Sequence, residues 1–312
     1  MALHRLASVT MGVPQPAETA AYYTEFGLTE AGGGWLASRD GGRQLRIVPA
    51  PTRRLVELGV GVDDPDDLAA AASRLSALGV GADVRAGLAD GRLAAVEPVT
   101  GVRAVLRVEP RITQPPVAAT PYNGPGRTER PDVRAPAVLR EDRVRPRKLG
   151  HAVLGTPDFA ATTAFFRDGL GFRVSDLMGE AGAFLRCSTD HHNLLVLAAP
   201  LAFLHHTSWQ VEDVDEIGRG ATSMLADHPE RHVWGLGRHH AGSNFFWYLK
   251  DPAGNFSEYY SDLDCILDDQ LWKPEVFDGA RGLYNWGPPP PPSFINPDDL
   301  AELMAGLHGG RA

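Results

Sequence analysis

The chain has 312 residues, of which 43% are hydrophobic and 22% charged, a composition typical of a globular protein. A chain of this length predicts two domains. The formal net charge of −9 is spread along the sequence, so no basic surface is expected for a nucleic acid or an anionic membrane.

Targeting segments and disulfides are not expected either. The opening residues, MALHRLASVTMGVPQP, contain no apolar segment of signal-peptide length, and no segment approaches the ~20 apolar residues of a membrane span. We therefore predict a cytoplasmic protein with neither membrane nor nucleic acid as a partner. The two cysteines, Cys187 and Cys265, lack CxxC spacing and are expected to be buried thiols.

An internal repeat organises the chain. The segment VPQPAETAAYYTEFGL (Val13–Leu28) resembles TPDFAATTAFFRDGLGF (Thr156–Phe172). Further along, LRIVPAP at 45–51 aligns with LLVLAAP at 194–200, and Val62 aligns with Val211 at the same offset of 149 residues. A constant offset over two segments predicts that the two halves share one architecture.

Each half is expected to contain two units, and each unit a strand, an amphipathic helix and further strands. In the second half, helices are predicted to begin at Pro157-Asp158 and at Asp213. The strands of this half are predicted at 151–156, 182–188, 193–199, 207–211, 245–251 and 256–262. The strand at 193–199 is apolar enough to be central.

The expected fold is therefore α+β, with four βαβββ modules paired into two domains. The predicted boundaries are 1–110 for the first domain, 111–146 for a linker rich in Pro and Arg, 147–264 for the second domain and 265–312 for a Pro-rich tail. The linker is expected to be extended and to wrap the surface. The proline run at 288–292 is expected to form a strap over the surface rather than a docking site, and a short helix is expected from Asp298.

The halves differ at three potential metal ligands. Each ligand of the second half aligns with a different residue in the first: His151 with Ser8, His206 with Glu57, and Glu258 with Val105. Two imidazoles and one carboxylate, with coordination positions left open, suit a non-haem Fe(II) that binds substrate and O2 together. Such a set can also hold catalytic zinc, so the residues alone leave the metal open.

The segments GHAVLGTPD, LHHTSW and GRHHAGSNFFWYLKDPAGNFSEYYSD together resemble the type I extradiol ring-cleaving dioxygenases of the vicinal oxygen chelate superfamily. That family has two domains of two βαβββ modules, with the metal only in the C-terminal one. The resemblance implies that His151, His206 and Glu258 bind Fe(II), or Mn(II), with His205 as a neighbour of the ligand. It implies a catechol-type substrate, O2 as co-substrate and a role in aromatic catabolism, and we also expect a homo-oligomer.

Further roles follow from the same resemblance. His192 falls where the family places an acid/base histidine beside the O2 site. His191 is the adjacent residue and could be confused with it. His239 and Tyr248 fall on catalytic positions that hydrogen-bond the bound diol. Trp234 falls where one branch of the family carries an arginine for a substrate carboxylate, so an indole there favours an apolar substituent.

Two other functions have to be separated from ring cleavage. A metal-dependent isomerase or lyase of the glyoxalase type needs an ionisable base near the metal but no O2. A non-enzymatic small-molecule-binding protein of the same superfamily generally lacks the metal triad. The sequence does not identify the catechol.

Overall fold

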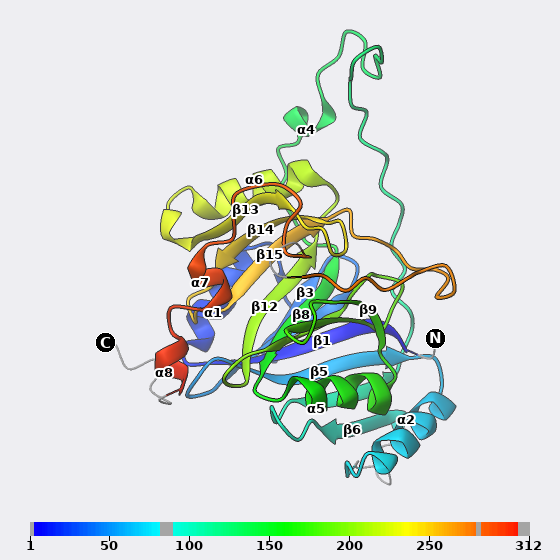
Figure 1. Ribbon diagram of the computed structural model, residues 1–312. Helices are drawn as coiled ribbons and strands as arrows, with labels where there is room; N and C mark the ends of the chain where they lie inside the picture. The colour runs from blue at the N-terminus through cyan, green and yellow to red at the C-terminus, as the bar shows by residue number, and fades with distance from the viewer. Residues whose placement is uncertain (1–2, 82–89, 279–281, 305–312) are drawn as a thin grey trace.

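The computed structural model describes residues 3–81, 90–278 and 282–304 and contains two mixed β-sheets with helices packed on them (Figure 1). The first sheet has seven strands in the order β2-β3-β4-β1-β5-β7-β6. They are β1 (Leu3–Val13), β2 (Thr29–Glu30), β3 (Trp35–Ser38), β4 (Gly42–Pro49), β5 (Arg54–Val62), β6 (Arg92–Val96) and β7 (Arg103–Val108). Helices α1 (Pro16–Glu25) and α2 (Pro65–Ala77) belong to this half.

The second sheet has eight strands in the order β13-β14-β15-β12-β8-β11-β10-β9. They are β8 (Lys148–Thr156), β9 (Arg173–Leu177), β10 (Gly182–Arg186), β11 (Leu194–Ala198), β12 (Phe203–Gln210), β13 (His232–Arg238), β14 (Phe245–Lys250) and β15 (Phe256–Ser261). Its main helices are α5 (Phe159–Ala164), continued by a π-helical turn at Phe165–Leu170, and α6 (Val214–Leu225). The strand at 193–199 is interior, as predicted.

The pairing of the strands confirms the modular α+β architecture. In every module the first strand pairs in parallel with the last: β1 with β4, β5 with β7, β8 with β11, and β12 with β15. The opening strands of two modules then pair antiparallel, β1 with β5 and β8 with β12. Three modules have the full βαβββ order; in the described part of the second module two strands follow α2.

Aspartates at helix starts explain where the helices of the second half begin. The Asp158 side chain accepts a hydrogen bond from the amide of Ala161 at 2.9 Å, and that of Asp213 accepts one from the amide of Glu216 at 2.9 Å. A carboxylate at the N-cap satisfies an amide that has no partner within the helix. Both helix starts lie where the sequence predicts them.

The two halves share one hydrophobic core. Helix α1 of the first half packs on β15 of the second, where the rings of Phe26 and Tyr259 stack with centroids 3.8 Å apart. The Tyr259 hydroxyl donates to the Phe26 carbonyl at 2.6 Å, and Tyr22 shares a 2.6 Å hydrogen bond with Ser257. These contacts fix the sheet that carries Glu258 against the first half.

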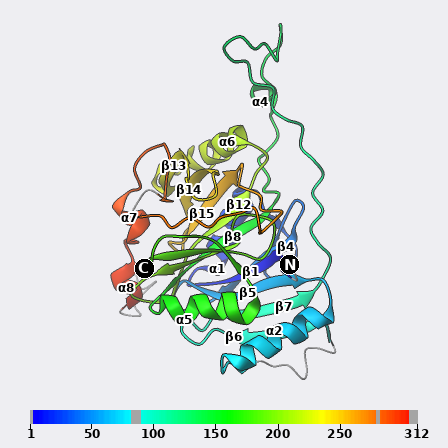
Figure 2. The same cartoon turned by 45° about the vertical axis from the view of Figure 1, so that its right-hand side comes forward.

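The connection between the halves differs from the expected wrapping linker. Figure 1 and Figure 2 show the chain between β7 and β8 rising away from the body as a long arm that carries the short helix α4 (Pro136–Leu139). Near the base of the arm, Arg140 forms a salt bridge with Asp213 at 2.7 Å. The domain and linker boundaries given above stay predictions.

The C-terminal segment lies over the second half, as expected for a strap. Isolated bridges join Asp190 to Cys265, Leu177 to Val276 and Arg238 to Trp286. Two short helices follow, α7 (Pro292–Ile295) and α8 (Leu300–Met304). What the sequence did not indicate is that α7 closes a cavity over the second sheet.

Two smaller expectations are settled by burial and helix length. Cys187 is buried as predicted, but Cys265 is exposed, because it lies in the tail outside the core. In the described part of the chain, none of the helices combines the length and apolar character needed to cross a membrane.

Candidate metal centre

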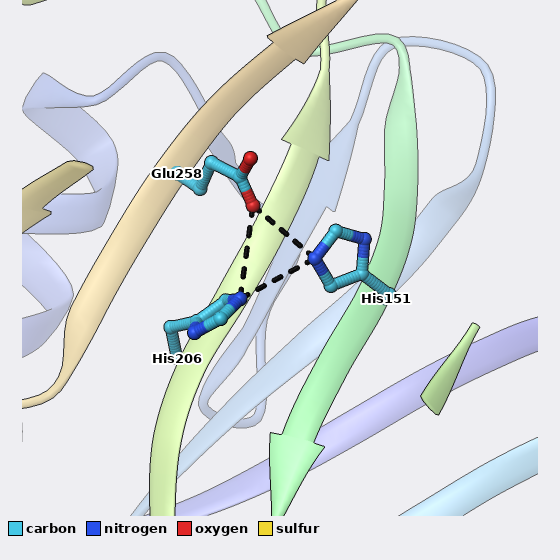
Figure 3. A group of neighbouring side chains, drawn as sticks. All are labelled: His151, His206 and Glu258. Carbon is cyan, nitrogen blue, oxygen red and sulfur yellow. Dashed lines mark hydrogen bonds and ion pairs between the residues drawn. The ribbon is translucent and has the colours of Figure 1, made fainter. Parts of the chain in front are cut away.

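His151, His206 and Glu258 lie on three adjacent strands, β8, β12 and β15, and their side chains converge (Figure 3). His151 Nε2 lies 3.3 Å from His206 Nε2 and 3.2 Å from Glu258 Oε2. His206 Nε2 lies 3.7 Å from the same carboxylate oxygen. All three residues are buried. The strand order brings together residues that are up to 107 positions apart in the sequence.

The donor atoms fit a divalent metal ion. Glu258 Oε2 is buried and accepts no hydrogen bond of good geometry from the described residues, although His151 Nε2 lies 3.2 Å away. A buried carboxylate oxygen without a donor is costly, and a cation bound between this oxygen and two imidazole nitrogens removes the cost. Two histidines and one carboxylate are a donor set for Fe(II) or Mn(II) that leaves positions open for other ligands.

The protonation states suit coordination. Burial, and after it the neighbouring imidazole of His205, lower the pKa of His206 well below its ordinary value, which favours the neutral imidazole that binds metals. Burial opposes the ionisation of Glu258, but the contacts with His151 and His239 outweigh it and hold its pKa below the ordinary range. The carboxylate is therefore ionised at neutral pH.

His205 orients the ligand His206. The pairing of β12 with β8 shifts between Leu204 and His206, so His205 lies at a bulge and its ring contacts that of His206. His205 Nε2 donates to the carbonyl oxygen of Phe294 at 2.6 Å, which leaves His205 Nδ1 as the acceptor for His206 Nδ1–H at 2.7 Å. His206 Nε2 is then the unprotonated nitrogen, and it is the one that faces His151 and Glu258.

Asn244 plays the corresponding part for the carboxylate. Its amide nitrogen donates to Glu258 Oε1 at 3.2 Å, so Oε2 is the oxygen turned toward the histidines. Asn244 is fully buried. It lies within GSNFFWY, but a lone asparagine before a strand is a common turn residue, so the sequence alone does not indicate this role.

His192 lies directly beside the ligands. Its ring centroid is 4.1 Å from that of His151, it is buried, and burial together with His151 lowers its pKa well below the ordinary value. His239 and Tyr248 lie on the Glu258 side, and the Tyr248 hydroxyl donates to His239 Nε2 at 2.9 Å. His239 Nδ1 donates to the Leu283 carbonyl, which fixes this tautomer.

These groups face a cavity of about 330 Å³. Its polar wall contains His151, His192, His206, His239 and Tyr248. The remainder is mainly apolar and includes Val153, Met178, Phe184, Leu195, Leu197, Phe203, Ala241, Leu283, Phe294, Ile295 and Leu300. No arginine or lysine is among the described residues that line it.

Trp234 lies behind this wall. It is 1% exposed, stacks on Tyr248 at a centroid distance of 5.6 Å, and its indole nitrogen donates to the carbonyl of Pro288 at 2.7 Å. It is not one of the residues that line the cavity. Its predicted effect on a substrate would therefore have to act through Tyr248 and the C-terminal segment.

In the first half, an ion-pair cluster occupies the strand positions that correspond to the triad of the second half. Ser8 pairs with Gly59 and Gly59 with Val105, just as His151 pairs with Ser208 and Ser208 with Glu258. The alignment of the halves is thus supported by register. Glu57, at the position of His206, forms salt bridges with Arg103 at 2.8 Å and Arg107 at 2.9 Å.

Comparison with protein-family models finds a match within the second half of the chain. Residues 148–259 match the model described as the Glyoxalase/Bleomycin resistance protein/Dioxygenase superfamily. The match covers both modules of the second sheet, including all three residues of the triad, and agrees with the vicinal-oxygen-chelate fold expected from the sequence.

Curated relatives of the chain include an enzyme named as an extradiol dioxygenase. The chain is 41% identical over 163 residues to metapyrocatechase 2 of Cupriavidus necator, covering 51% of each protein. It is 34% identical over 139 residues to an iron-dependent extradiol dioxygenase of Rhodococcus jostii, covering 40% of this chain and 46% of that one. The chain thus spans about half the length of these relatives.

Solved structures with the same fold cover nearly the whole chain. A Mn(II)-bound glyoxalase from Novosphingobium aromaticivorans superposes with a TM-score of 0.72 at 24% identity, over 93% of both chains. Homoprotocatechuate 2,3-dioxygenase from Arthrobacter globiformis superposes with a TM-score of 0.72 at 21% identity, over 94% of this chain and 91% of that one. At these identities the likeness establishes the shared fold.

Proposed function

We propose that this protein is an extradiol dioxygenase that cleaves the ring of a catechol-type diol and inserts both atoms of O2. The observation that carries the proposal is the triad of His151, His206 and Glu258, whose two histidines line an apolar cavity. His192 lies on one side of the triad and His239 with Tyr248 on the other. The relationship to metapyrocatechase 2 supports the same reaction.

The triad is proposed to hold Fe(II), with Mn(II) as the ion that the same ligands can also bind. When bound, the ion would supply open coordination positions, a positive charge that favours the diol anion, and a path for electrons from the diol to O2. The 34% identity to an iron-dependent relative supports iron.

The chain's own residues are proposed to move protons and position the ring. His192 Nε2 has no hydrogen-bond partner among the described residues, so it can take a proton from a diol hydroxyl and return it to a product oxygen. On the opposite wall the Tyr248 oxygen can accept a hydrogen bond from the diol, and His239 Nε2 holds the Tyr248 hydroxyl in place. The apolar remainder of the cavity excludes water and strengthens these polar contacts.

The lining favours an uncharged substrate. A catechol that carries a carboxylate would lose its hydration in a cavity whose described lining has no arginine or lysine. A neutral catechol with an alkyl or aryl substituent would instead bury apolar surface against Val153, Phe184 and Leu195. We therefore propose a neutral, substituted catechol as the substrate and expect 3-phenylcatechol to have a higher kcat/KM than 3,4-dihydroxyphenylacetate.

Oxygen labelling tests the reaction. The anaerobically Fe(II)-loaded protein should consume O2 and diol one to one and give a yellow ring-opened product that contains both atoms of ¹⁸O2. Product formed at the same rate without O2 would favour an isomerase or lyase. Diol that binds without turnover in the metal-loaded protein would favour a binding protein.

A further inference from the structure

Asp176, His191 and His192 form a chain of hydrogen bonds that leads to the cavity. His191 Nε2 lies 2.9 Å from Asp176 Oδ2, and His191 Nδ1 lies 3.0 Å from His192 Nδ1. Asp176 lies on β9, and the two histidines precede β11. His191 is fully buried and Asp176 is 4% exposed.

The direction of these hydrogen bonds follows from the available protons. A carboxylate only accepts, so His191 must donate from Nε2 to Asp176. A neutral imidazole has one N–H, so His191 Nδ1 is left as an acceptor, and His192 must donate to it from Nδ1. His192 Nε2 is then unprotonated, at the ring edge away from His191, in a side chain that lines the cavity.

We propose that Asp176 and His191 are positioning residues that hold His192 as its Nδ1–H tautomer and so make His192 Nε2 a proton acceptor at the cavity. The acid/base role of His192 rests on the proposed function; its tautomer does not. In the reaction the O–H bond of a diol hydroxyl breaks as the Nε2–H bond forms. The imidazolium so formed can return that proton to a product oxygen.

Two aromatic rings pack on His191. The rings of Phe184 and Trp272 lie with centroids 5.8 and 5.3 Å away, and they offer its nitrogens no further hydrogen-bond acceptor. The charge of Asp176 is already shared: its Oδ1 accepts the amide of Glu275 at 2.7 Å, and the guanidinium of Arg186 interacts with it electrostatically.

Asp176→Asn is a sharp test because the orientation of the new side-chain amide is constrained. The carbonyl of that amide must replace Oδ1 to accept the Glu275 backbone N–H, so its NH2 group replaces Oδ2 and faces His191 Nε2. An NH2 group donates, which reverses the chain: His191 becomes Nδ1–H, His192 accepts at Nδ1, and its proton moves to Nε2. The volume of the side chain hardly changes.

The tautomers can be read by ¹⁵N NMR of the metal-free full-length protein labelled at histidine. We expect His192 as the Nδ1–H form in the parent and as the Nε2–H form in D176N. The exposed Asp168, paired with Arg167, gives a matched control, because D168N should leave the His192 signals unchanged. In the Fe(II)-loaded enzyme, D176N should lower kcat about 100-fold with KM changed only a few-fold.

Three results would overturn the proposal: an Nε2–H tautomer of His192 in the parent, a doubly protonated His191 in the parent, or an unaltered His192 tautomer in D176N. Should D176N not fold, His191→Leu serves instead. It should leave His192 as a mixture of tautomers, and a pure Nδ1–H form would contradict the positioning role. A protein that consumes no O2 but shows the expected tautomers would refute the dioxygenase function alone.

Discussion

His206 donates a hydrogen bond from Nδ1 to Nδ1 of its sequence neighbour His205, over 2.7 Å. The same relationship recurs 14 residues earlier, where His191 and His192 are joined over 3.0 Å. In each pair an acceptor fixes the first ring, the Phe294 carbonyl in one case and the Asp176 carboxylate in the other. The second ring then presents Nε2 to the site. In these two pairs, His205–His206 and His191–His192, the first ring therefore orients the second.

The first prediction concerns His205. Replacing it with Ala should preserve the triad but lower metal affinity about 10- to 100-fold, because partners that orient a ligand contribute on this scale. Asn at this position can still accept from His206 Nδ1–H and should recover part of the affinity. Metal titration against a chelator measures both. The control is His228→Ala, which changes a half-exposed histidine that does not line the cavity. Affinity in H205A equal to that of the parent would mean that the strand alone orients His206.

The second prediction concerns the number of metal ions. Glu258→Ala and His206→Ala should each abolish metal binding, since two remaining ligands hold a divalent ion poorly. Glu57→Ala changes the residue of the first half that corresponds to His206 and that pairs with Arg103 and Arg107. This variant should keep one ion per chain. Elemental analysis gives the stoichiometry. Two ions per chain in the parent would contradict the comparison of the halves.

The third prediction concerns acid stability of the metal-free protein. Burial lowers the pKa of His205 from 6.5 to about 4, so the unfolded chain binds more protons between these values. The unfolding free energy should therefore fall as the pH drops from about 6.5 to 4, by roughly 3 kcal/mol from His205 alone. His192 and His206, with pKa values also lowered by burial, add to the fall.

Denaturant unfolding at pH 7 and pH 5 checks this. Asp251, whose pKa burial raises to about 6, contributes with the opposite sign between about 3.8 and 6, so the parent alone is not diagnostic. The comparison of the parent with His205→Asn is diagnostic, because that variant has lost one titrating group. Its pH dependence should be shallower than that of the parent, and equal slopes would refute the assignment.

The convergence of the three candidate ligands could be predicted because the first half of the chain supplies an equivalent position for each of them. His151, His206 and Glu258 stand where the first half has Ser8, Glu57 and Val105, and register keeps these positions equivalent. Helix starts were also readable, since Asp158 and Asp213 act locally on the next turn.

The residues that support the ligands could not be found in this way. The acceptor for His205 is a backbone carbonyl 89 residues away, at Phe294, and any residue type supplies a carbonyl. Asp176 meets His191 only because β9 is the edge strand next to β10. The part of the cavity wall that α7 supplies likewise depends on how the C-terminal tail folds back. A proline run predicts an extended segment but does not say which residues that segment contacts.

The last prediction concerns Arg53, which ties that wall to the first half. Its side chain is 1% exposed and forms a salt bridge with Asp299 of the C-terminal segment at 2.6 Å. It also donates to the carbonyl of Leu204, the residue before the histidine pair. Asp299→Asn leaves this buried cation without its carboxylate and should cost on the order of 3 kcal/mol of unfolding free energy. The single variant Arg53→Met removes the buried cation itself. It should cost less unfolding free energy than D299N, because the carboxylate that remains is 17% exposed.

Asp63→Asn is the matched control, because the Arg111–Asp63 pair is exposed and should contribute less than about 1 kcal/mol. The functional consequence should be selective. Loosening the segment that carries Phe294 opens the apolar wall, so D299N should raise KM for a substituted catechol several-fold while one Fe(II) per chain is retained. If D299N instead loses the metal at unchanged KM, the segment acts on the His205–His206 pair and not on the substrate.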